Sequence, residues 1–213
     1  MQHSLPATLE AERTAVEADI RTAFRGVTRE GGVSWSEADV IDSYGSDEER
    51  ARARAKDLDT SWEALVEDSH WDHDTAGCNF CFLDPIGVRY YLAAAMIRCL
   101  RENDGQFTAF ALTLNVDRAD LREYRLNQWS LLKPDHQRVI ARFLRFMIAA
   151  TWAPGENMDD CYWREAYDSY WRTLYPDGPS DGAAPLPPDT PDLTPYLLSC
   201  STTSNPSGPS PAS

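Results

Sequence analysis

The chain has 213 residues, and its 34 acidic and 20 basic side chains give a formal net charge of −14. This balance argues against sequence-independent nucleic-acid binding, which needs lysine and arginine to neutralise phosphates, and an anionic membrane surface would repel the chain. No apolar run reaches the roughly 18 residues of a membrane span, and no secretory signal is visible at the N-terminus. We therefore expect a cytoplasmic protein.

The composition changes sharply at Pro176. Ten of the 14 prolines lie from there onward, in a stretch without lysine or arginine. Such a segment buries too little apolar surface to offset the entropy of ordering it. We predict a helical domain over residues 1–175 and a disordered tail over 176–213. One apolar run, Leu193–Leu198, interrupts the tail. It could fold back on the domain or bind a partner, although a solvated tail with a few chance apolar residues is the simpler interpretation.

The beginning of the domain predicts two helices. Val16, Ile20 and Phe24 recur every four residues, which indicates an amphipathic helix over about 6–26. Ser34 and Glu37 then form a capping box, in which each side chain binds the other residue's backbone amide. The short helix behind this box is expected to end at Gly45.

A second capping box follows at Ser46–Glu49, and one continuous helical face is predicted behind it. We interpret the basic side chains of the opposite face as solvated and do not assign them to nucleic acid, because acidic residues flank them. The predicted buried face consists of Ala51, Ala55, Leu58, Trp62 and Leu65, and the basic face of Arg50, Arg52, Arg54 and Lys56.

The middle of the domain contains the clearest helix start. Asp84 is a typical N-cap, and Pro85 suits the first helical position because its missing N–H is not needed there. This helix is expected to end at Asn103. From Phe107 to Val116 the apolar residues alternate with a period of two. One strand cannot form a sheet, so the segment is either an extended connector or a helix with a misleading pattern.

Two helices complete the domain. One begins at Pro134 and ends before Pro154. The final helix carries an aromatic stripe of Trp163, Tyr167, Tyr170 and Trp171. Such a stripe either docks its helix onto the domain or presents a binding surface, and we favour docking.

The metal candidate is a cluster of two histidines and two cysteines, His70, His73, Cys78 and Cys81. These side chains could bind zinc tetrahedrally, but the twelve-residue span is shorter than in known arrangements, which favours a plain loop. A redox role for the two cysteines is weaker still, because the following helix starts beyond Cys81. We expect reduced thiols, and we expect Cys99 to pack as a small apolar side chain.

No catalytic constellation is apparent. Asp68, Asp72 and Asp74 lie beside the histidines and could support acid–base chemistry, but proximity by chance is expected in so acidic a chain. His136 falls in the first turn of its helix, where we expect an exposed side chain. We therefore assign no catalytic, metal-binding or cofactor-binding residues.

Two stretches resemble a bacterial family of uncharacterised proteins. Residues 82–94 resemble its hallmark, Phe-Leu-Asp/Ser-Pro-x-Gly-x-x-Tyr-Tyr-Leu-Pro-Ala, and residues 132–144 resemble a later Leu-x4-Gln…Phe-Leu segment. Ala93 stands where the family has proline, so the helix is expected to run straighter. The histidines and cysteines of 70–81 lie outside the pattern. The resemblance implies a small helical bacterial protein and no mechanism.

These observations predict a mainly α, single compact multi-helix domain. For function we expect a non-catalytic interaction protein that binds a basic protein partner, with an immunity or antitoxin-like role as one form. The alternative is a metal-dependent enzyme or zinc-stabilised regulator that uses the cluster at 70–81. We expect no nucleic-acid partner, no membrane partner and no cofactor.

Overall fold

The computed structural model describes residues 7–57, 61–74, 79–115, 117–151 and 161–175. The predicted tail, Cys78 and the turn before Pro154 lie outside these ranges. The described residues form helices and no strand, which confirms the mainly α fold. Among them, no helix is long and apolar enough to cross a bilayer.

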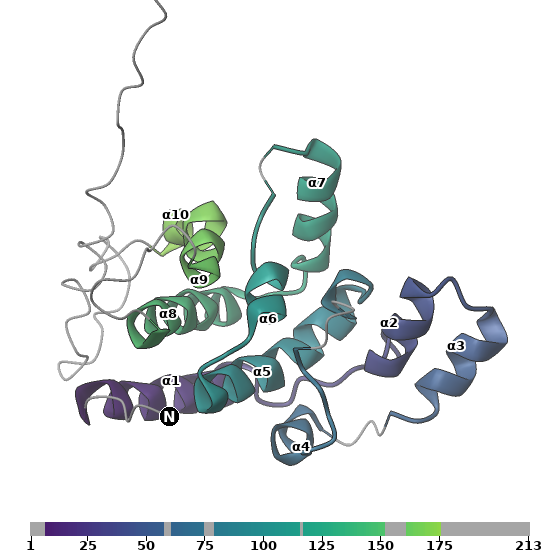
Figure 1. The fold of residues 1–213 in the computed structure, drawn as a ribbon, viewed down its shortest axis with the longest axis horizontal. Coiled ribbons are helices and arrows are strands. Elements are labelled where there is room, and N and C mark those ends of the chain that lie inside the picture. Colours follow the sequence, from purple (N-terminus) through teal and green to yellow (C-terminus); the bar gives the residue numbers. More distant parts are fainter. Residues whose placement is uncertain (1–6, 58–60, 75–78, 116, 152–160, 176–213) are drawn as a thin grey trace, which may run out of the picture.

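The helix α5 (Pro85–Glu102) lies at the centre of the domain (Figure 1). Twelve of its eighteen residues are buried, so it is surrounded on most sides. The side chain of Asp84 caps it by accepting a 2.8 Å hydrogen bond from the Gly87 amide. Asn103 ends it in the left-handed conformation, with φ of 55°. The predicted start and end are both confirmed.

The helices α1 (Ala7–Ala23) and α8 (Pro134–Thr151) pack against each other on one side of the domain. Val16, Ile20 and Phe24 are fully buried, as their spacing predicted. The guanidinium of Arg142 on α8 binds the buried carboxylate of Glu12 with two 3.0 Å hydrogen bonds. The contact between α1 and α8 therefore combines apolar packing with a partly buried ion pair.

At the other end of the domain lie α2 (Trp35–Asp42) and α3 (Asp47–Arg54), and both predicted capping boxes are present. The single face predicted from Ala51 to Leu65 is wrong. Ser61 accepts a hydrogen bond from the Ala64 amide and so begins a separate helix, α4 (Trp62–Glu67). Ala51 and Ala55 are exposed, whereas Ala53 is buried. A local cap thus overrides the apolar spacing.

The segment with alternating apolar residues is helical over its first half. Gly105, with φ of 137°, precedes α6 (Gln106–Ala111), and residues 113–115 form no regular secondary structure. The next helix, α7 (Ala119–Gln128), was not predicted, because only Arg125 and Gln128 of its residues are buried. It therefore has no apolar period to detect.

The last helix contains one wide turn. It begins as α9 (Tyr162–Ala166), widens into the π-helical turn η3 (Tyr167–Trp171) and ends as α10 (Arg172–Leu174). Trp163, Tyr167 and Trp171 are fully buried. The indole of Trp171 donates a 2.8 Å hydrogen bond to the Leu112 carbonyl. The aromatic stripe thus docks the helix onto the domain, as we favoured.

Candidate functional site

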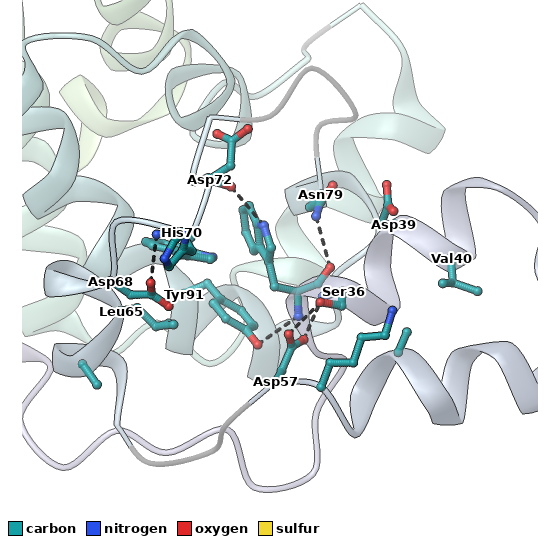
Figure 2. A pocket seen from close by; sticks show the side chains of 15 residues that line it. Ser36, Asp39, Val40, Asp57, Leu65, Asp68, His70, Asp72, Asn79 and Tyr91 are labelled. Atoms are coloured by element: carbon teal, nitrogen blue, oxygen red, sulfur yellow. Dashed lines mark hydrogen bonds between the residues drawn. The ribbon is translucent and has the colours of Figure 1, made fainter.

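A cleft of about 540 Å³ opens between α2, the end of α3, α4 and the loop of residues 68–72 (Figure 2). We call it the acidic cleft. Its lining combines an aromatic floor with four carboxylates and one lysine. The floor is Trp35, Trp71 and Tyr91, and the charged residues are Asp39, Asp57, Asp68, Asp72 and Lys56.

Hydrogen bonds fix Trp35 in the aromatic floor. The Trp35 backbone amide donates a 2.9 Å hydrogen bond to the Tyr91 hydroxyl, and the Trp35 indole donates a 3.1 Å bond to the Asp72 carbonyl. Asn79 donates a third bond, 3.1 Å long, to the Trp35 carbonyl. The rings of Trp71 and Tyr91 each lie 5.2 Å from the Trp35 ring, centroid to centroid. Burial raises the pKa of the Tyr91 hydroxyl, which therefore stays neutral.

The four carboxylates of the cleft differ in how they are bound. Asp57 accepts hydrogen bonds from the amide and hydroxyl of Ser36, at 2.8 and 2.7 Å, and so ties the end of α3 to the start of α2 (Figure 2). Asp68 accepts a 2.9 Å bond from the His70 amide. The residues Asp39, Asp68 and Asp72 are exposed. Three of the four carboxylates of the lining therefore belong to solvent-exposed residues.

A buried carboxylate holds the two helices that form one wall of the cleft. Glu37 of α2, which is 2% exposed, accepts hydrogen bonds of 2.7 Å from Nε and 2.7 Å from Nη2 of Arg54. Arg50 adds a bond of 3.3 Å. Two of the four side chains of the basic face that was predicted to be solvated, Arg50 and Arg54, therefore bind this carboxylate.

The predicted metal ligands do not gather in one place. His70 is exposed and lines the acidic cleft, whereas His73 is buried with its Nε2 3.8 Å from Glu102. Cys81 lines a different cavity, and Cys78 lies outside the described residues. Within the described ranges, no group of three potential ligands could hold a metal ion. Burial lowers the pKa of His73, and Glu102 opposes this shift.

The exposed position expected for His136 is wrong. This side chain is 3% exposed, and its ring stacks on Phe24 with 4.2 Å between centroids. Its Nε2 lies 3.1 Å from the Ala23 carbonyl, and its Nδ1 accepts a 3.2 Å bond from the Lys133 amide. The contact with α1 comes from 113 residues away, so no local pattern indicates it. Cys99 is fully buried, as predicted, and burial raises its thiol pKa.

The hallmark stretch has a structural role that the geometry explains. Besides capping α5, the Asp84 carboxylate accepts a 3.1 Å hydrogen bond from the Val33 amide. A Cβ on Gly87 would lie only 2.7 Å from the Val33 carbonyl oxygen, so glycine allows the backbone before α2 to approach α5. Tyr91 then binds Trp35. These residues position the aromatic floor, and the sequence pattern alone did not reveal that link.

Most of the cleft was not found from the sequence. Asp68 and Asp72 lie close together in the sequence, but no local pattern connects them with Asp39, Asp57 or Trp35. The contact between Ser36 and Asp57 spans 21 residues, and that between Trp35 and Tyr91 spans 56. Only the capping box at Ser34 placed Trp35 at the start of a helix, and nothing local indicated what that helix faces.

A comparison with models of protein families assigns most of the chain to one family. The model of a family of unknown function, DUF6714, matches residues 12–175. This range contains the acidic cleft and every described helix except the first turn of α1. No curated protein and no solved structure matches the chain. The chain therefore belongs to DUF6714, a family of unknown function.

Proposed function

We propose that this protein is a non-catalytic interaction module that binds a basic segment of a partner protein in the acidic cleft. The observation that carries the proposal is the composition of this cleft, whose lining includes four aspartates, one lysine and an aromatic floor. Carboxylates attract lysine and arginine side chains, and aromatic faces add a cation–π attraction of about 0.5–2 kcal/mol.

The rigidity of the floor supports binding. Three hydrogen bonds fix Trp35, and two fix Asp57 against α2. A site that is already ordered loses little conformational entropy when a ligand enters. The carboxylates of Asp39, Asp68 and Asp72 belong to exposed residues of the cleft and would contact the basic side chains of the partner directly.

An immunity or antitoxin-like role in the cytoplasm fits this chemistry. An acidic surface accelerates association with a basic effector and neutralises its charge. The net charge of −14 extends the same attraction over the whole molecule. The cleft would then supply the specific contacts, and the remaining charge would supply the approach.

A labelled oligo-arginine peptide tests the cleft directly. We expect the full-length protein to bind it, with the affinity falling as salt rises, measured by fluorescence anisotropy. The triple variant D39N/D68N/D72N should bind about tenfold more weakly, a loss of about 1.4 kcal/mol. The matched control D120N/E123N/D135N removes three exposed carboxylates from α7 and α8, which do not line the cleft.

The control variant distinguishes binding in the cleft from attraction by the overall charge. If it retains affinity within about twofold, the cleft and not the overall charge binds the peptide. An equal loss in both triple variants would overturn the proposal. Affinity capture from native lysate at about 50–150 mM salt extends the test to natural partners. A basic protein recovered by the wild type and missed by D39N/D68N/D72N would support the proposal. Failure to recover any such protein would count against the proposal.

A further inference from the structure

A second cavity, of about 650 Å³, lies between the segment after α6, the helix α7 and the last helix. We call it the apolar groove. Phe110, Leu121 and Tyr124 line it and are 52%, 42% and 47% exposed. Large apolar side chains gathered in one concave site are typical of a binding surface.

The groove is preformed. The Tyr124 hydroxyl donates a 2.7 Å hydrogen bond to the Cys81 carbonyl, which fixes α7 against the turn before α5. The guanidinium of Arg125 lies 5.6 Å from the centre of the Phe110 ring. On the opposite wall, the Leu114 amide donates a 2.9 Å bond to the Ser169 hydroxyl. An occupant would therefore find its apolar contacts already in place.

The last helix forms one wall of this groove and is the final described element of the chain. Asp168 and Ser169 line it, and the described part of the chain ends six residues later at Tyr175. The seventeen residues 176–192 can extend over about 56 Å. A folded domain that ends at Tyr175 has a radius of gyration of about 15 Å. The following segment can therefore reach any point of the groove.

That following segment is the apolar run Leu193–Leu198, whose large apolar side chains are Leu193, Tyr196, Leu197 and Leu198. Covalent attachment raises the effective concentration of this segment near the groove to the millimolar range. At that concentration even a weak apolar contact is populated.

We infer that the apolar groove is the docking site of the chain's own segment Leu193–Leu198. The acidic cleft is lined by other residues, so this docking and the proposed partner site are tested separately.

Two cysteines make the contact measurable. Cys81 lines the groove, and Cys200 follows Leu198 by two residues. In the full-length variant C78S, the oxidant diamide takes up the two thiol hydrogens as a disulfide forms. We expect an intramolecular Cys81–Cys200 disulfide, mapped by mass spectrometry of peptides. The variant C78S/L121D should form it about tenfold more slowly, because the aspartate disrupts the groove and lowers the effective concentration of the segment.

A matched control and a second readout complete the test. Tyr44 is 97% exposed and does not line the groove, so C78S/Y44D should react like C78S. Hydrogen exchange of the amides in 196–200 should be slowed in the wild type and fast in L121D. A Cys81–Cys200 disulfide that links two chains would overturn the inference in favour of a second copy. Equal rates in C78S and C78S/L121D, or fast exchange in the wild type, would overturn it outright.

Discussion

The backbone amide of Trp35 donates a 2.9 Å hydrogen bond to the hydroxyl of Tyr91, 56 residues further along the chain. This bond joins the first residue of α2 to the central helix α5 beneath the acidic cleft. It satisfies an amide at a helix N-terminus, where no intrahelical partner exists. The same contact thus joins two helices of the fold and supports the aromatic floor of the candidate site.

The variant Tyr91→Phe should therefore destabilise the protein by about 1–3 kcal/mol, the cost of leaving a buried amide without a partner. Urea unfolding followed by circular dichroism measures this loss. Tyr44→Phe, at a 97% exposed position, is the control and should change stability by less than about 0.5 kcal/mol. Equal stability of Tyr91→Phe and the wild type would show that the hydrogen bond contributes nothing.

The two capping boxes offer a matched comparison. Glu37 is buried and binds Arg50 and Arg54, whereas Glu49 occupies the same capping-box position on an exposed surface. We expect Glu37→Gln to cost about 2 kcal/mol, since it leaves the arginines without their buried charge partner. Glu49→Gln should cost less than about 1 kcal/mol. Unfolding in urea ranks the two, and the reverse order would contradict the role of Glu37.

At Gly87, helix propensity and packing predict opposite results. Alanine stabilises a helix interior relative to glycine by about 1 kcal/mol. Here the added Cβ would lie 2.7 Å from the Val33 carbonyl oxygen, and overpacking typically costs about 1–3 kcal/mol. We expect Gly87→Ala to lower the thermal midpoint. A higher midpoint would mean that the backbone before α2 can shift away without loss.

Stability should fall as the solution becomes more acidic, in part through His136. Burial lowers the pKa of this imidazole, and the charges of Lys133 and Arg89 act in the same direction. The Ala23 carbonyl and Asp135 oppose the shift. Because the folded-state pKa lies below the unfolded value of 6.5, the unfolded chain binds the proton more readily. The contribution is complete above about pH 6.5 and declines as the pH falls below it.

The variant His136→Gln tests this assignment. Urea unfolding at about pH 7.5 and 5.5 gives the change in unfolding free energy between them, on either side of the ordinary histidine pKa. We expect that change to be smaller in the variant than in the wild type. His73→Gln is the comparison, since the pKa of His73 is also lowered by burial. An unchanged pH dependence in His136→Gln would assign the effect to other groups.

The sequence predicted those elements whose signals are local. Ser34, Ser46 and Asp84 each cap a helix through a side chain and an amide three residues away, so a short pattern suffices. The helix α7 gave no such pattern, because it is held by polar contacts. Gln128 donates 2.8 Å hydrogen bonds to the carbonyls of Phe80 and Leu83, 48 and 45 residues back.

The acidic cleft shows the same limit. Its carboxylates were visible as residues, but their grouping depends on Asp57 reaching Ser36 and on Trp35 lying over Tyr91. Neither contact has a local signature. The aromatic stripe was easier to interpret, since four large rings on one helix face favour burial wherever the helix lies.

The wide turn at Tyr167–Trp171 has a consequence for relatives of this chain. There the amide of Arg172 donates to the carbonyl of Tyr167, five residues back instead of four. Such a turn equals an ordinary helical turn with one residue inserted. A homologue that lacks one residue here can keep a regular helix and still bury aromatic side chains on the same face. We therefore expect alignments of the family to show a single-residue gap at 167–171, without loss of the surrounding core.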